Sequence, residues 1–206
     1  MSHRSQKEIL AKYLPLHSVD EVYQLIEHHH IHLQIKAARS TKLGDFKAPH
    51  NGLPARLSIN GDLNAYGFLI TLIHEIAHWL VWDQYKASRR IRPHGTEWKN
   101  TFKQLMAPFL KPEVFPKDLL YVLSQHMENP KASSSSDLKL MKALKEYDAG
   151  EKHLLLADLE VGHYFSLKGK SFQVQKKNRS RFLCTEIKTK RKFLVHSMAE
   201  VESIEP

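Results

Sequence analysis

The chain has 206 residues, of which 42% are hydrophobic, a formal net charge of +9 and one cysteine. This length suffices to bury one hydrophobic core and a small second one. A single cysteine excludes an intrachain disulfide and a four-cysteine zinc ribbon, and a reducing cytoplasm is the expected location. The polar N-terminal segment does not resemble a secretory signal. The most apolar stretch, residues 68–82, is too short and too polar to cross a membrane, so no membrane partner is expected.

The net charge is concentrated in one segment. Residues 166–196 contain ten Lys and Arg side chains and a single acid, Glu186, so this segment alone has a charge of +9. The rest of the chain holds 21 basic and 21 acidic side chains and is therefore neutral. A local excess of this size indicates a polyanionic partner for that segment.

Helices are predicted at the start of the chain. A short helix over residues 5–14 is expected to end before Pro15. Ser18, followed three residues later by Glu21, has the pattern of a capping box. We therefore expect a second helix to begin there and to end near residues 28–30.

Three strands and a long helix are predicted next. Apolar and polar residues alternate over residues 31–36, which is the period of a strand, and residues 41–46 and 56–60 are expected to form two more. Asn64 is a plausible N-cap for a helix that continues to about Tyr85. Its apolar side chains recur at helical spacing and are expected to face a core.

The pattern changes in the second half of the chain. A break at Pro93-His94-Gly95 precedes a helix from Thr96, and three prolines then make the chain irregular. A serine-rich linker and a short helix follow. From about residue 159, four short strands are expected, over residues 163–167, 171–175, 181–185 and 192–196. We therefore predict an α+β domain over residues 1–130, a linker with a short helix over 131–150, and a small basic β-rich module over 151–206.

The sequence His74-Glu75-Ile76-Ala77-His78 fits the pattern H-E-x-x-H. On a helix, His74 and His78 lie one turn apart on the same face, so both imidazoles can reach one zinc ion. Glu75 is offset from them and is expected to act as a general base rather than as a ligand. A catalytic zinc keeps three protein ligands and one open position. Two residues could supply the third ligand, and His94 at the chain break is favoured over Glu97, which is expected to support the helix N-terminus or a ligand ring.

The chain resembles the SprT-like family of zinc metallopeptidases, which includes the eukaryotic Spartan proteases. The resemblance is carried by Leu72–Trp79 together with Pro93–Trp98, and residues 56–60 resemble that family's strand before the zinc helix. It covers roughly residues 15–115. It implies a zincin-like fold, zinc on His74, His78 and His94, Glu75 as the base, and protein substrates, which some members cleave when the substrate is attached to DNA. Many members end in a cysteine-rich zinc ribbon, whose place is taken here by the basic module.

The basic module interleaves phenylalanines with its cations. This pattern suits single-stranded nucleic acid, with cations on phosphates and rings under bases. The strand alternation favours the alternative for the rings, in which the phenylalanines form the core of a tiny barrel and the lysines solubilise its surface. The residues expected to contact DNA or another nucleic acid are Lys168, Lys170, Lys176, Lys177, Arg179, Arg181, Lys190, Arg191 and Lys192.

The predicted function is therefore a zinc-dependent endopeptidase that acts on a protein or peptide, including proteins associated with nucleic acid. Zinc activates water and Glu75 transfers its proton. Two alternatives stay open. The chain could be a nucleic-acid-binding protein whose zinc site is structural or catalytically idle, or a peptidase whose basic module docks onto proteins.

Overall fold

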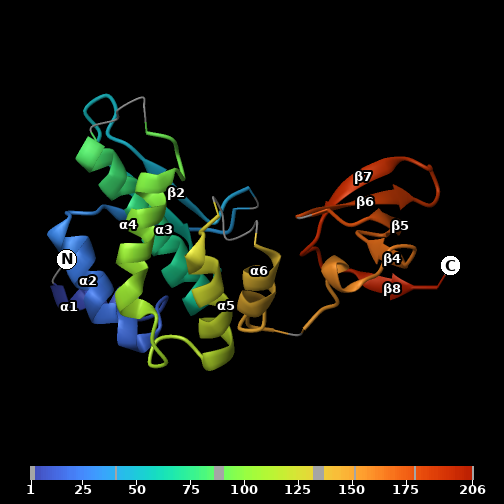
Figure 1. Cartoon of the computed structure of the whole chain (residues 1–206), viewed down its shortest axis with the longest axis horizontal. Helices are drawn as coiled ribbons and strands as arrows, with labels where there is room; N and C mark the ends of the chain where they lie inside the picture. Colours follow the sequence, from blue (N-terminus) through green and yellow to red (C-terminus); the bar gives the residue numbers. More distant parts are fainter. Residues whose placement is uncertain are drawn as a thin grey trace. The chain divides into compact units, whose positions relative to one another are not determined.

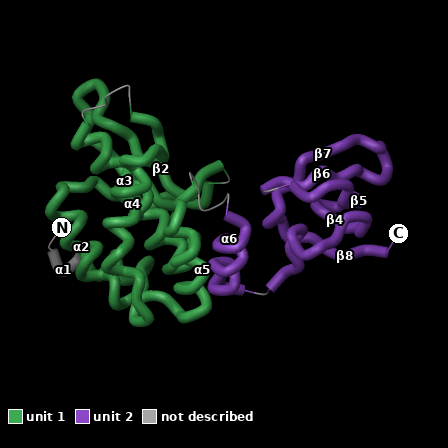
Figure 2. The backbone as a smooth tube through the Cα atoms, viewed as in Figure 1, with its two compact units in different colours: residues 1–132 green, residues 133–206 purple. Residues whose placement is uncertain are grey.

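A computed structural model describes residues 3–39, 41–85, 91–131, 137–150, 152–178 and 180–205. The chain divides into two compact units, unit 1 over residues 1–132 and unit 2 over residues 133–206 (Figure 2). Both units contain helices and strands, so the predicted α+β class is confirmed. The predicted serine-rich linker, residues 132–136, lies outside the described residues, as does Arg179. None of the helices in the described ranges combines the length and apolar character that a membrane span requires.

Unit 1 is built from helices around a three-stranded sheet (Figure 1). The strand order is β1-β3-β2, with β1 parallel and β2 antiparallel to the central strand. Its elements are α1 (His3–Leu10), the 3₁₀ helix η1 (Leu16–Ser18), α2 (Val19–His28), β1 (Leu33–Lys36), β2 (Gly44–Lys47), β3 (Arg56–Asn60), α3 (Ala65–Tyr85), α4 (Thr96–Met106), the 3₁₀ helix η2 (Ala107–Phe109) and α5 (Lys117–Glu128).

The centre of unit 1 is α3, which packs against β2, β3 and α4. Asn64 caps this helix as predicted, because its side-chain oxygen accepts a hydrogen bond of 2.9 Å from the backbone N–H of Gly67. Apolar residues along the helix, among them Leu72, Ile73 and Ile76, are fully buried. The helix that carries the H-E-x-x-H sequence is therefore held rigidly within the core.

Four predictions for the N-terminal elements were wrong in detail. Strand β1 begins at Leu33 rather than at residue 31. Helix α1 ends at Leu10, four residues earlier than expected. Ser18 forms no capping box, because its backbone is helical and its hydroxyl donates to the carbonyl of Pro15 at 2.7 Å. This hydroxyl instead closes the 3₁₀ turn that leads into α2. The second strand begins at Gly44 rather than Thr41.

Helix α5 was not predicted. The prolines before it interrupt the helical pattern. Pro116, however, stands immediately before the first residue of α5, where the absence of a backbone N–H removes no hydrogen bond of the helix. Leu119, Leu123, His126 and Met127 form the buried face of this helix.

Unit 2 contains a five-stranded antiparallel sheet with the order β7-β6-β5-β4-β8. Four strands coincide closely with the predicted ones, and the short edge strand β8 was not predicted. One face of the sheet covers a separate core, to which Phe165, Phe172, Phe182 and Cys184 contribute. The elements are α6 (Leu138–Lys145), the 3₁₀ helix η4 (Leu156–Asp158), β4 (Tyr164–Leu167), β5 (Lys170–Lys176), β6 (Arg181–Glu186), β7 (Lys192–His196) and β8 (Glu202–Ile204).

Candidate metal centre

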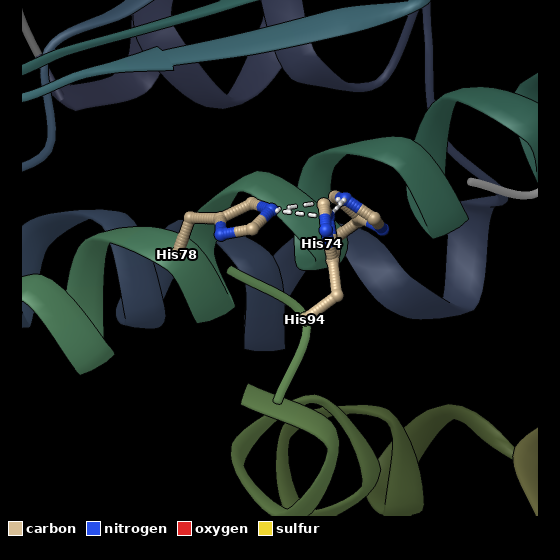
Figure 3. A group of neighbouring side chains, drawn as sticks. All are labelled: His74, His78 and His94. Carbon is tan, nitrogen blue, oxygen red and sulfur yellow. Dashed lines mark hydrogen bonds between the residues drawn. The ribbon is translucent and has the colours of Figure 1, made fainter. Parts of the chain in front are cut away.

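Three histidines of unit 1 converge on one point (Figure 3). His74 and His78 project from the same face of α3, one turn apart, and His94 comes from the segment that precedes α4. His94 has a φ of 59°, the left-handed conformation that non-glycine residues rarely adopt. The adjoining turn is closed by a hydrogen bond of 2.9 Å from the backbone N–H of Gly95 to the carbonyl of Arg92. This tight turn aims the His94 ring at α3.

The Nε2 atoms of the three rings form a nearly equilateral triangle. The distances are 3.2 Å between His74 and His78, 2.9 Å between His78 and His94, and 3.2 Å between His94 and His74. The three Nε2 atoms cannot all form hydrogen bonds with one another, because each carries either one hydrogen or one lone pair. Nitrogen ligands about 2.0–2.1 Å from a tetrahedral zinc stand about 3.3 Å apart. The arrangement therefore fits a metal ion, and this group of histidines could hold one.

The surroundings keep these rings neutral, which a metal ligand requires. Burial lowers the pKa of His74 to about 3, with further contributions from His78, His94 and His126. Burial and the neighbouring His94 lower the pKa of His78 to about 4. The pKa of His94 is also lowered by burial. Lone pairs are thus available on all three rings at neutral pH.

The ring of Trp98 packs against all three histidine rings. Its ring centroid lies 4.5 Å from that of His74, 5.4 Å from that of His78 and 4.7 Å from that of His94. The indole N–H donates to the backbone carbonyl of His74 at 3.4 Å, and Phe102 stacks beneath at 5.0 Å. With 1% of its surface exposed, Trp98 restricts the rings to this arrangement and excludes water from below.

Glu75 is buried on α3, on the side of the helix that faces β2. Its carboxylate accepts a hydrogen bond from the backbone N–H of Phe46. Burial, together with the nearby Asp45, raises the pKa of Glu75 to about 7 against the opposing effects of Phe46, Arg39 and Lys42. A carboxyl group with this pKa can both accept and release a proton near neutral pH.

The close approach of β2 to Glu75 depends on Gly44. A Cβ atom at this position would lie 2.7 Å from Glu75 Oε1 and 2.7 Å from Thr71 Cγ2. Both distances are far shorter than van der Waals contact allows. Glycine at residue 44 is therefore what lets the strand lie directly against the carboxylate.

A polar network anchors the segment before β2. The Arg39 guanidinium donates to the side-chain oxygens of Asn60 at 2.7 Å and of Ser58 at 3.0 Å. The buried Asn60 amide donates in return to the carbonyls of Arg39 at 3.2 Å and of Lys42 at 3.0 Å. This network connects β3 to the segment that leads into β2, and so fixes the strand beside Glu75.

Glu97 does not belong to the group of side chains that could hold a metal ion. It lies in the first turn of α4, and one of its carboxylate oxygens is 3.3 Å from the position that a Cβ of Gly95 would occupy. Its negative charge is therefore close to the helix N-terminus, which it stabilises.

An aromatic cluster adjoins Glu75 along the same side of α3. Trp79 and Trp82 stack with ring centroids 5.6 Å apart, and Phe46 of β2 lies 6.1 and 6.4 Å from them. The Trp79 indole N–H is buried, and no hydrogen-bond partner for it is found among the described residues. Phe46 thus contacts the carboxylate through its backbone and the tryptophans through its ring.

Sequence reasoning did not identify several neighbours of the site. Arg39, Gly44 and Asp45 lie on or before a strand whose start was misplaced, and His126 is buried on the unpredicted helix α5. The signal that could have identified His126 is the spacing of Leu119, Leu123, His126 and Met127, which places them on one helical face.

The predicted nucleic-acid contacts do not form one cluster. Lys168, Lys170, Lys190, Arg191 and Lys192 lie at or beside the turns that connect β4 to β5 and β6 to β7. Lys176, Lys177 and Arg181 lie at the opposite end of the sheet, next to the β5–β6 connection. Arg179 is outside the described residues.

Comparison with models of known protein families, with curated proteins and with solved structures gives no significant match. Functional inference therefore depends on the geometry of the site and on the residues that form it.

Proposed function

We propose that unit 1 is a zinc-dependent endopeptidase with a zincin-like fold of the SprT-like type. The observation that carries this proposal is the group of three converging imidazoles, with a buried carboxylate on the same helix one residue after the first of them. Glu75 adjoins His74 in sequence but contacts β2 instead of joining the ligand group. A carboxylate beside a metal site, and not bound to the metal, is the arrangement that metal-assisted hydrolysis requires.

The donor set favours zinc. Three neutral imidazoles would hold it through Nε2 of His74, His78 and His94, and a three-histidine set leaves a coordination position for water or substrate. Zinc bound there would supply Lewis-acid chemistry, which activates water and polarises a carbonyl group. The apolar floor formed by Trp98 and Phe102 strengthens these electrostatic effects, because it lowers the local dielectric constant.

Glu75 transfers the proton in this mechanism. Its carboxylate accepts a proton from the attacking water and then delivers it to the nitrogen of the leaving amine. The backbone N–H of Phe46 orients the carboxylate, and the Arg39–Asn60 network orients the strand that carries Phe46. The base is therefore positioned by contacts that exist before any substrate binds.

The position of β2 supports a peptide as the substrate. This strand is at the edge of the three-stranded sheet and lies directly beside Glu75. An extended peptide can add to such an edge through main-chain hydrogen bonds, which suit any sequence. The adjoining rings of Phe46, Trp79 and Trp82 offer an apolar surface to substrate side chains.

The test is cleavage of an unfolded protein by purified, zinc-loaded chain and by Glu75→Gln. Because Glu75 is not a ligand, the variant is expected to keep one zinc and the fold, and to lose about 10²- to 10⁴-fold in cleavage rate. Glu97→Gln is the matched control, since it changes the same group in the neighbouring helix and should retain activity. Equal cleavage by Glu75→Gln and the wild type would refute the mechanism.

A second function is favoured by the charge of unit 2. The chain would then be a nucleic-acid-binding protein whose zinc is structural or catalytically idle. The same experiment separates the two functions, because an idle site gives no zinc-dependent cleavage in the wild type.

A further inference from the structure

Two turns of unit 2 bring the basic residues of separate segments to one end of the sheet. The β4–β5 turn consists of Lys168 and Gly169, with φ values of 52° and 72°, which is the geometry of a tight two-residue hairpin. The β6–β7 connection spans residues 187–191. Ile187 donates its backbone N–H to the carbonyl of Ser171 at 2.9 Å, so the two turns are adjacent.

We call this region the hairpin end. It gathers six cations from two turns and the strand residues beside them: Lys168, Lys170, Lys188, Lys190, Arg191 and Lys192.

The single acid of this segment does not neutralise the hairpin end. The Glu186 side chain is 6% exposed and is used internally. One carboxylate oxygen accepts a hydrogen bond from the hydroxyl of Thr189, and the other pairs with Lys170 at 3.1 Å. Glu186 thus shapes the β6–β7 turn and offsets one cation. The other five cations of the hairpin end are exposed.

The opposite end of the sheet is less basic. Lys177 forms an ion pair of 3.0 Å with Glu160, and its ammonium group also lies 5.8 Å from the ring centroid of Phe182. Lys176 and Arg181 are the described exposed cations there. Among the described residues, the hairpin end therefore has five exposed cations beyond Lys170 and the opposite end has two, Lys176 and Arg181. The exposed acid Glu202 of β8 pairs with Ser166 near the β4–β5 turn and offsets part of this charge.

An exposed aromatic ring lies among these cations. Phe193 follows Lys192 in β7 and is 39% exposed. Its ring is fixed by an edge-to-face contact with Phe172, with centroids 5.7 Å apart, and the ammonium group of Lys170 lies 6.0 Å from its centroid. An anchored ring loses little conformational entropy when a planar group stacks on it.

From this arrangement we propose that the hairpin end binds single-stranded nucleic acid, with the exposed cations on phosphates and Phe193 under a base. Unpaired bases expose faces on which an aromatic ring can stack, whereas the bases of a duplex are stacked on one another. The proposal concerns unit 2 alone and is independent of what the zinc site does.

The experiment measures binding of the full chain to a fluorescently labelled single-stranded oligonucleotide of about 20 thymidines by anisotropy, over a range of salt concentrations. For single-stranded nucleic acid, a plot of log affinity against log salt concentration has a slope of about −0.7 for each phosphate that the protein neutralises. The double variant Lys188→Glu, Arg191→Glu should therefore lower affinity about 10-fold or more and reduce the slope by about 1.4. Lys176→Glu, Arg181→Glu is the matched control at the opposite end, and should change affinity about 3-fold or less.

Phe193→Leu tests the stacking contact, because leucine keeps an apolar side chain against Phe172 but has no ring. It should lower affinity for the oligonucleotide about 5-fold or more and leave affinity for polyglutamate, a polyanion without bases, unchanged. Equal losses from the two charge reversals would contradict a site at the hairpin end. Undiminished binding by Phe193→Leu, or preference for duplex or polyglutamate, would contradict single-stranded recognition. Thermal unfolding of each variant verifies that the fold is intact.

Discussion

At the scale of single residues, the most informative position is His94. A left-handed backbone at a non-glycine residue costs about 1–3 kcal/mol and persists where surrounding structure enforces it. Here the strained residue is the one that brings the third imidazole within 2.9 and 3.2 Å of the other two. The unusual backbone conformation is therefore found at the residue that supplies the third nitrogen of the candidate metal centre.

This position allows the proposed set of metal ligands to be tested. His94→Ala should lose most of its zinc after dialysis against a mild chelator, since two imidazoles remain, whereas Glu97→Ala should retain one zinc per chain. Elemental analysis of both variants measures the difference. Zinc retained by His94→Ala but lost from Glu97→Ala would mean that the carboxylate is the ligand.

The sequence allowed part of the site to be predicted at this scale. His74 and His78 follow from helical spacing, and His94 follows from its place at a chain break beside the next helix. Arg39, Asp45 and His126 could not be predicted in the same way. They reach the site through loop conformation and helix packing, which depend on contacts between distant parts of the chain.

At the scale of elements, the position of the Glu75 carboxylate depends on how β2 packs against α3. This strand has four residues, and its Gly44 faces Glu75 and Thr71. The boundaries of β3 and α3 were predicted closely because each has a clear apolar pattern and α3 has a cap. The start of β2 was misplaced because a short edge strand is defined by its partner rather than by its own sequence.

The packing of β2 can be tested by Gly44→Ala. The added methyl group meets Glu75 Oε1 and Thr71 Cγ2 at 2.7 Å, so the strand must move. We expect a loss of about 1–3 kcal/mol in the free energy of unfolding, measured by urea denaturation, and a lower cleavage rate.

Gly67→Ala in the first turn of α3 is the matched control for Gly44→Ala. Its Cβ would meet nothing closer than 3.5 Å, and alanine favours the helix by up to about 1 kcal/mol, so stability should be unchanged or higher. Wild-type stability and activity in Gly44→Ala would show that the strand does not need this close approach.

At the scale of the whole molecule, the candidate metal centre and the excess positive charge belong to different units. The three histidines that could hold a metal ion lie in unit 1 together with Glu75, whereas the basic segment lies in unit 2. Each unit buries its own apolar side chains. Trp98, Phe102 and Ile73 are in the core of unit 1, and Phe165, Phe172 and Phe182 are in that of unit 2.

Because each unit has its own core, we predict that zinc stabilises unit 1 and not unit 2. A ligand that binds only the native state raises the free energy of unfolding by RT ln(1 + [L]/Kd), about 4 kcal/mol at a thousandfold excess over Kd. For a unit of this size we expect chelation by EDTA to lower one calorimetric transition by about 10 °C or more. The second transition should stay in place, and isolated residues 133–206 should reproduce it with and without EDTA. His74→Ala is the control, since its transitions should not respond to the chelator. If EDTA moved both transitions of the intact chain together, the two units would unfold as one cooperative structure.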